Sequence, residues 1–397
     1  MASKSPIIKP RVIIHGGAGN ITRDNLSKEQ WQTFESDLLA ILRSTSQQLV
    51  QHGATALHAA THAVQLFEAN PKFNAGRGAV FTRSGRIELE ASVMVSNGMK
   101  KRGAAVSLLK HVKSPVSLAA EILKRGEHAD NGGAQGHVHI SGASAEELAG
   151  DYGLEMCDES FFWTKKRWEE HKKTLSNECN SEDVSIDLVW PDNDPSWDGK
   201  EYLPQGTVGC AVLDQFGTVA IATSTGGITN KLDGRIGDTP TFGAGFWAEE
   251  WFTHRHVPPT TSLSTALLDC LPSLSGYLPL ASAPRIEEVR HAAGLLGTGN
   301  GDSFLRVAAV RTAIAVARFS NVPLPDAIKW MAGSNGELQR SAGERWHKTG
   351  EGEGGIIGIE FADGKGRPVF DFNCGGLFRA WVDDEGAEHA MVFKEKY

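Results

Sequence analysis

Apolar and polar positions repeat with two different periods in the first part of the chain, and these periods predict both strands and helices. The apolar run 11–15 leads into a glycine turn, as a short buried strand does. Residues 87–95 alternate apolar and polar side chains with period two, which predicts a second strand. Residues 28–69 have helical spacing that Gly53 divides into two helices, the second with an apolar face made of Leu57, Ala60, Val64 and Phe67.

Further along the chain, shorter patterns predict strands at 103–109, 355–361 and 368–373, a hairpin from 207–213 and 218–223, and helices from Pro115, near 145–150 and over 302–319. The hairpins and helices are segregated rather than alternating as βαβ units. This order predicts an α+β layered sandwich.

Residues 176–205 interrupt these patterns. Between Glu178 and Glu201 the chain carries eight acidic residues against one base, Lys200, and apolar periodicity disappears. Such a composition predicts an exposed, mobile linker, although a surface excursion of one domain would look similar.

Composition narrows the classes of function. Hydrophobic residues make up 40% of the 397 residues and charged residues 22%, as in globular proteins. A net charge of −8 argues against a nucleic-acid partner, and the absence of a long apolar run argues against a membrane span. Five cysteines without a Cys-x-x-Cys pair, and a polar N-terminal stretch, predict a reduced, cytoplasmic setting without structural zinc or disulfides.

Common catalytic motifs are missing from the sequence. It contains no Gly-x-Ser-x-Gly elbow, no His-Glu-x-x-His pair and no phosphate-binding loop. His58 and His62 are four residues apart on a predicted helix, and we interpret them as ordinary helix histidines rather than metal ligands. No catalytic cofactor is therefore expected.

Thr207 is the strongest candidate nucleophile, because it stands at the start of a strand directly after the acidic segment. A threonine hydroxyl needs a base, and a free α-amine on the same residue can act as one at near-neutral pH. That chemistry requires cleavage between Gly206 and Thr207. Taken alone, Thr207 could equally be an ordinary strand threonine.

The residues that follow supply further polar groups. Thr225 lies near the end of the partner strand, where its hydroxyl could approach Thr207. Arg235 and Asp238 are a cation and an anion three residues apart in a glycine-rich loop. Such a pair matches the carboxylate and ammonium groups of an α-amino acid, although a surface salt bridge is the simpler interpretation.

Residues 206–245 resemble the β-subunit start of the plant-type asparaginases, or isoaspartyl peptidases, which are threonine N-terminal nucleophile hydrolases. Other marks of that family occur in order, namely His15-Gly-Gly-Ala-Gly19, Phe73-Asn-Ala-Gly76, Glu88-Leu-Glu-Ala-Ser92, Gly297-Thr-Gly-Asn-Gly-Asp302 and Gly354-Gly-Ile-Ile-Gly358. The resemblance implies a four-layer αββα sandwich. It also implies an α subunit 1–206 and a β subunit 207–397 that form one folded domain, with L-asparagine and β-aspartyl dipeptides as substrates.

The resemblance assigns roles to individual residues. Thr207 would attack the amide carbonyl. Thr225 would hydrogen-bond the Thr207 hydroxyl and help set its reactivity, and Asn74 would lie near it. Arg235 would bind the substrate carboxylate, while Asp238 and the Gly301 carbonyl would bind the ammonium group. Thr298 and the Gly299 N–H would form the oxyanion hole. The family also holds a structural sodium by backbone carbonyls, here those of Phe67, Glu68, Asn70, Phe73, Ala75 and Arg77, and it assembles as an (αβ)₂ dimer of heterodimers.

The sequence departs from the family pattern at a few positions. Glu90 replaces an aspartate, Asn300 and Asp302 replace threonine and glutamate, and the stretch 249–296 is longer than expected. We interpret that stretch as a neutral surface insertion, with a lid or an interface element as alternatives. Three other functions remain open from sequence: a glycosylasparaginase, a threonine-aspartase-like protease and an uncleaved, non-enzymatic homologue.

Overall fold

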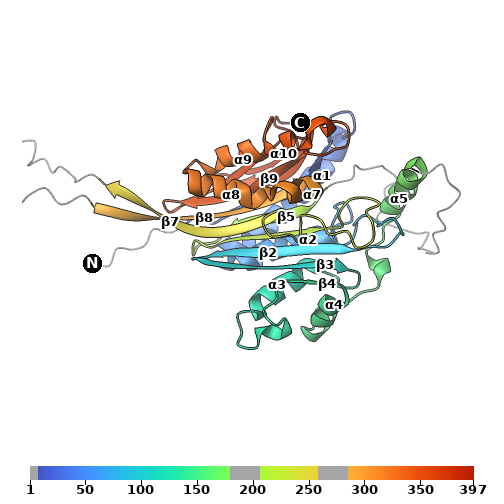
Figure 1. The fold of residues 1–397 in the computed structure, drawn as a ribbon, viewed down its shortest axis with the longest axis horizontal. Helices are drawn as coiled ribbons and strands as arrows, with labels where there is room; N and C mark the ends of the chain where they lie inside the picture. Colours follow the sequence, from blue (N-terminus) through green and yellow to red (C-terminus); the bar gives the residue numbers. More distant parts are fainter. Residues whose placement is uncertain (1–7, 179–205, 258–284) are drawn as a thin grey trace, which may run out of the picture.

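The computed structural model describes residues 8–178, 206–257 and 285–397, and Figure 1 shows the arrangement of their helices and strands. Before the first gap lie β1 (Arg11–Gly19), α1 (Lys28–Val50), α2 (Ala56–Ala69), β2 (Leu89–Asn97), β3 (Lys100–Leu109), α3 (Pro115–Arg125), β4 (His139–Ser141), α4 (Gly142–Asp151) and α5 (Lys165–Glu178). After it come β5 (Val208–Leu213), β6 (Val219–Thr225), β7 (Phe246–Val257), β8 (Arg285–Gly299), α7 (Gly301–Val307), α8 (Ala309–Ser320), α9 (Leu324–Ala332), α10 (Glu337–Ala342), β9 (Gly354–Ala362), β10 (Lys365–Phe372), β11 (Gly376–Val382) and β12 (Glu388–Met391).

Two sheets carry the fold of the described residues. One has eight strands in the order β12-β11-β1-β5-β6-β2-β3-β4, and the other has four in the order β10-β9-β8-β7. The hairpin predicted around residue 215 is confirmed, because β5 and β6 pair antiparallel from Val208 opposite Ser224 to Leu213 opposite Val219. In the larger sheet, strands from before and after the 179–205 gap are therefore interleaved.

Within the part of the chain that the structure describes, three hydrophobic clusters hold the elements together. One joins α1, α2 and α3 to the larger sheet, and includes Phe34, Val64 and Leu118. A second fills the space between the two sheets, and the third packs α7–α10 against the smaller sheet. Figure 1 shows α8 and α9 on one side of the molecule and α3 and α4 on the opposite side. The mixed α+β class predicted from sequence is confirmed.

Local sequence explains where the first helices begin. Ser27 accepts a hydrogen bond from the Gln30 N–H, and the Gln30 side chain accepts one from the Ser27 N–H, which together form a capping box at the start of α1. Thr55 caps α2 through the His58 N–H. The division of 28–69 into two helices is thus confirmed, with Gly53 in the left-handed region between them.

The structure corrects two sequence predictions. The single helix expected over 302–319 is two helices, α7 and α8, because Ala308 adopts left-handed angles of φ 45° and ψ 51° that end the first. Residues 176–178, which were expected in the linker, belong instead to α5, which continues to Glu178. The remainder of that linker, 179–205, lies outside the described residues.

The long stretch 249–296 is only partly a surface insertion. β7 and β8 pair antiparallel from Phe246 opposite Leu296 to Val257 opposite Arg285, whereas β9 pairs with β8 only from His291 onward. The two strands therefore extend past their sheet, as Figure 1 shows. Residues 258–284 of the stretch lie outside the described residues. No helix among the described residues is long and apolar enough to cross a membrane.

Candidate active site

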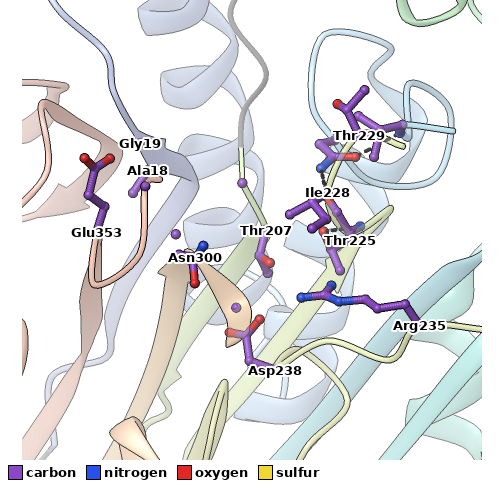
Figure 2. A pocket seen from close by; sticks show the side chains of 17 residues that line it. Ala18, Gly19, Thr207, Thr225, Ile228, Thr229, Arg235, Asp238, Asn300 and Glu353 are labelled. Carbon is purple, nitrogen blue, oxygen red and sulfur yellow. Dashed lines mark hydrogen bonds between the residues drawn. The ribbon is translucent and has the colours of Figure 1, made fainter. Parts of the chain in front are cut away.

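A cavity of about 360 Å³ opens where β5, β6 and the start of α7 meet. Nine residues were expected at the site, and eight of them line this cavity: Asn74, Gly206, Thr207, Thr225, Arg235, Asp238, Gly299 and Gly301. Figure 2 shows the side chains of Thr207, Arg235 and Asp238 pointing toward one another. Segments that are far apart in the sequence thus meet around one hydroxyl group.

Thr207 immediately precedes β5, which lies between β1 and β6 in the larger sheet. Its side-chain oxygen is 2.9 Å from the Thr239 Oγ1, and its main-chain carbonyl accepts a hydrogen bond of 3.2 Å from the Thr298 Oγ1. Only 7% of Thr207 is exposed. The central strands therefore hold this hydroxyl in a fixed position at the edge of the cavity.

His15 lies against the beginning of β5. Burial lowers its pKa to about 3, and a contact with the Thr207 backbone opposes this shift only partly. The imidazole is therefore neutral at pH 7. Neither ring nitrogen has a well-formed hydrogen bond within the described residues, although both are fully buried.

The hydroxyl of Thr225 serves a neighbouring loop. Its Oγ1 accepts a hydrogen bond of 2.9 Å from the Gly227 N–H, while the Asn74 Nδ2 donates one of 2.7 Å to the Gly227 carbonyl. Asn74 also accepts a bond from the Val80 N–H. Thr225 and Asn74 thus fix the turn after β6, and the hydroxyl in contact with Thr207 belongs to Thr239.

Arg235 and Asp238 both reach the cavity, and their environments differ. The Arg235 Nη2 donates to the Asp302 Oδ2 over 2.9 Å, and this pair is partly exposed. Asp238 is 5% exposed, and its Oδ2 has no hydrogen-bond partner among the described residues. Burial raises the pKa of Asp238 to about 7, although the Arg235 charge acts in the opposite direction. The site therefore contains the Arg235 cation and the Asp238 carboxyl group, whose ionised form a positively charged partner would stabilise.

Thr298 is the expected residue that does not line the cavity, because its side chain is fully buried behind it. A Cβ placed on Gly206 would lie 2.7 Å from the Thr298 Oγ1 and 3.4 Å from the Gly299 N. Thr298 and Gly299 therefore lie beside the peptide bond that precedes Thr207. Gly299 itself has φ 140°, a conformation that favours glycine.

Asn300 lines the cavity where sequence analysis expected only the neighbouring glycines. Its Oδ1 accepts hydrogen bonds from the Ser303 N–H and Oγ, and so caps α7. The Nδ2 of the same amide makes no hydrogen bond to the described residues. This amide is a second side-chain donor near the nucleophile. The position of Asn300 directly between Gly299 and Gly301 was the sequence signal that could have identified it.

Polar residues in β2 and directly before it hold the loop that carries Arg235 and Asp238. Glu88 accepts a hydrogen bond from the Gly234 N–H, Glu90 accepts one from the Gly237 N–H, and the Ser92 hydroxyl donates to the Thr239 carbonyl. These three side chains are two residues apart and so lie on one face, as the predicted period of two requires. All three are polar, and all three are buried. Sequence analysis identified the strand without identifying this function of its polar face.

The loop from Phe67 to Arg77 brings main-chain oxygens together. The Arg77 N–H donates to the Glu68 carbonyl over 2.7 Å, and a Cβ on Gly76 would lie 2.5 Å from that same oxygen. A Cβ on Gly78 would lie 2.4 Å from the Pro71 carbonyl oxygen. Main-chain carbonyl oxygens are neutral ligands of the kind that hard cations prefer. Among the described residues, no group of three or more His, Cys, Asp or Glu side chains could hold a metal ion. His58 and His62 therefore do not belong to such a group.

Comparisons with known proteins agree with the geometry. The model of a family described as asparaginase matches residues 8–253. An isoaspartyl peptidase of Salmonella typhimurium is 32% identical over 373 residues, which cover 94% of this chain and 95% of that protein. An isoaspartyl peptidase of Escherichia coli is 31% identical, with 98% and 97% covered. A probable isoaspartyl peptidase/L-asparaginase of Arabidopsis thaliana is 28% identical, with 96% and 98% covered.

Proposed function

The chain belongs to the asparaginase family, and on this premise we propose that it hydrolyses L-asparagine to L-aspartate and ammonia and cleaves β-aspartyl dipeptides. It is thus an amidohydrolase, with Thr207 as its nucleophile. The observation that carries the proposal is the convergence of Thr207, Arg235 and Asp238 on one cavity.

Maturation would begin with cleavage between Gly206 and Thr207, giving an α subunit 1–206 and a β subunit 207–397. The Thr207 hydroxyl would attack the Gly206 carbonyl of the preceding peptide bond through a five-membered ring, so that the acyl group moves from the Thr207 nitrogen to its oxygen. Water would then hydrolyse this ester and release the Gly206 carboxylate. Thr298 and Gly299 lie beside the Gly206–Thr207 bond and would stabilise the negative oxygen that forms during attack. The α-amine released on Thr207 would then act as the general base for substrate hydrolysis.

The substrate would bind through its amino-acid groups. Arg235 would form charge-assisted hydrogen bonds with the α-carboxylate, in place of its bond to Asp302. Asp238 would bind the α-ammonium group, with the Gly301 carbonyl as a second acceptor. A Cβ on Gly301 would lie 2.4 Å from the Asp238 Oδ1, so the glycine keeps this side of the cavity open. The side-chain amide would then reach Thr207.

The reaction would follow in two steps. The Thr207 Oγ attacks the amide carbonyl, its amine takes the hydroxyl proton and delivers it to the leaving nitrogen, and ammonia or an amine departs. Water then attacks the resulting ester, and L-aspartate leaves as the Thr207 hydroxyl recovers its proton. Thr298 and the Gly299 N–H are the expected donors to the oxyanion, and the Asn300 amide is a further donor that faces the cavity.

Several finer features of the family complete the proposal. The two sheets with their outer helices would form the four-layer αββα sandwich of N-terminal nucleophile hydrolases. The main-chain oxygens of Phe67, Glu68, Asn70, Phe73, Ala75 and Arg77 would hold a structural sodium, which would stiffen the loop that carries Asn74. The mature protein would be an (αβ)₂ dimer of heterodimers. The reaction needs no other cofactor.

Intact mass spectrometry of purified protein, fresh and after incubation, tests this proposal directly. We expect two chains whose masses divide the 42.8 kDa polypeptide between Gly206 and Thr207. Ammonia release from L-asparagine and amine release from β-aspartyl dipeptides then measure the two activities. A single uncleaved chain without activity would instead support a non-enzymatic homologue.

A further inference from the structure

We propose that Thr239 is a further catalytic residue, whose hydroxyl binds the nucleophilic oxygen of Thr207 and is held in place by Ser92. This inference rests on the proposed function, because it assigns a role within the same site. Thr239 lies outside the set of residues that the sequence suggested for the site.

The contact is direct and buried. The two Oγ1 atoms are 2.9 Å apart, and Thr239 is 1% exposed. Thr239 does not line the cavity, whereas Thr207 does. The Thr239 hydroxyl therefore approaches the nucleophile from the protein side and leaves the opposite side of Thr207 open to a substrate.

A hydroxyl in this place suits both halves of the reaction, because it can donate or accept a hydrogen bond. During attack, a bond donated by Thr239 orients the Thr207 Oγ while its proton goes to the amine. During release of the product, the Thr207 oxygen is an ester oxygen that can only accept, and Thr239 can donate to it as negative charge develops there. No proton has to leave Thr239 in either step.

The position of Thr239 is fixed by its main chain. Its carbonyl accepts a hydrogen bond of 2.7 Å from the Ser92 Oγ, and Ser92 is fully buried in β2. Two residues earlier in the loop, the Gly237 N–H donates to Glu90 over 2.9 Å. The buried polar side of β2 therefore sets the distance between Thr239 and Thr207, so that Ser92 acts as a positioning residue.

Thr239→Val tests the proposal, because valine keeps the shape and removes the hydroxyl. We expect cleavage before Thr207 to slow and kcat for L-asparagine to fall by about 10–100-fold, with KM within about twofold, since one buried hydrogen bond to the reacting oxygen is lost. Thr239→Ser keeps the hydroxyl and should restore kcat to within about fivefold of the unmodified protein.

Thr45→Val is the matched control, since the buried Thr45 hydroxyl donates to the Ile41 carbonyl within α1, and Thr45 does not line the cavity. It should leave cleavage and kcat close to those of the unmodified protein. Ser92→Ala keeps Thr239 and removes only its anchor, and should lower kcat by about 3–10-fold. This variant decides the question if Thr239→Val does not fold.

The outcomes separate this inference from the proposed function. Unchanged cleavage and kcat in Thr239→Val, or in Ser92→Ala if the valine variant is unfolded, would overturn the role of Thr239 while the hydrolase remained active. A rise in KM that equals the loss of kcat/KM would also overturn it, because the residue would then only shape the loop. Inactivity of the unmodified protein would instead count against the proposed function.

Discussion

His15 of β1 and Gly209 of β5 lie opposite each other in the antiparallel register, and a Cβ on Gly209 would be 2.5 Å from the His15 Nε2. The imidazole therefore occupies the space that any other residue at 209 would need. Because Gly209 is two residues after Thr207, this contact links the packing of the two central strands to the position of the nucleophile.

Gly209→Ala should destabilise the protein. The added methyl group would also lie 3.0 Å from the Leu296 Cδ1 and 3.1 Å from the Ala222 carbonyl oxygen. We expect a loss of about 1–3 kcal/mol in the free energy of unfolding, measured with denaturant before cleavage, and slower cleavage. Gly150→Ala is the control, since nothing lies within 4 Å of that Cβ in α4, and it should be neutral or stabilising. Equal stability of both variants would contradict a tight contact at His15.

Asp238→Asn should stabilise the protein while it abolishes substrate binding. The pKa of Asp238 is raised to about 7 in the folded state, whereas in the unfolded chain the carboxyl group ionises near pH 4. The folded protein therefore loses stability as the pH rises from about 4 to about 7. Arg235 keeps Asp302 as a partner in the variant. We expect a gain of about 1–3 kcal/mol at pH 8 and a smaller gain at pH 5, measured by thermal unfolding. A lower melting temperature at pH 8 would show that the carboxylate is needed for folding.

The same pKa predicts the pH dependence of activity. Asp238 must be ionised to bind an ammonium group, so kcat/KM for L-asparagine should fall as the pH decreases through about 7. Succinamic acid, which lacks the α-amino group, provides the control. Its kcat/KM should keep only the dependence on the Thr207 amine. Identical profiles for the two substrates would exclude Asp238 as the ammonium site.

Asp302→Asn should strengthen substrate binding. The substrate carboxylate has to replace Asp302 at Arg235, and the Asp302 side chain is 50% exposed, so the competing ion pair is weak. We expect KM for L-asparagine to fall by up to about fivefold with kcat nearly unchanged. Glu287→Gln breaks a more exposed pair with Arg255 outside the cavity and should change neither constant. A higher KM in Asp302→Asn would mean that Asp302 orients Arg235 for binding.

Asn300→Ala and Thr298→Val should separate the two side chains among the candidate oxyanion donors. Asn300 lines the cavity, whereas Thr298 lies behind it beside the Gly206–Thr207 bond. We expect the alanine variant to lower kcat for L-asparagine by about 10–100-fold, and the valine variant to slow cleavage more than it slows substrate hydrolysis. Normal kcat in Asn300→Ala would restrict the oxyanion site to Thr298 and the main chain.

Sequence motifs suggested Thr207, Arg235 and Asp238 as candidates, and the family resemblance assigned them roles as the nucleophile and the substrate-binding pair. The structure places all three around one cavity. Thr239 was not identified, although it directly follows Asp238, since its role depends on β2, which is more than a hundred residues away in the chain. The alternation at Glu88, Glu90 and Ser92 identified a strand. It could not show which segment of the chain packs against the polar side of β2, because periodicity gives no information about the segments that contact a strand.

Helix boundaries failed for a similar reason. Ala308 is a good helix former, and nothing in its own chemistry predicts the left-handed angles that separate α7 from α8. The long pairing of β7 with β8 was also not predicted, since residues 253–256 and 285–288 are mostly polar or charged and lack an apolar alternation. Contacts between distant segments decide such cases.

The interleaved order of the larger sheet has a consequence for the lifetime of the mature protein. β5 and β6, from after the proposed cut, lie between β1 and β2, from before it. The intact chain can form this sheet within one molecule. Once the bond before Thr207 is broken, the same sheet can be rebuilt only when two separate polypeptides meet, so refolding becomes concentration-dependent and competes with aggregation. The proposed cleavage would therefore make unfolding harder to reverse, and the lifetime of the cut protein would depend on how slowly it unfolds.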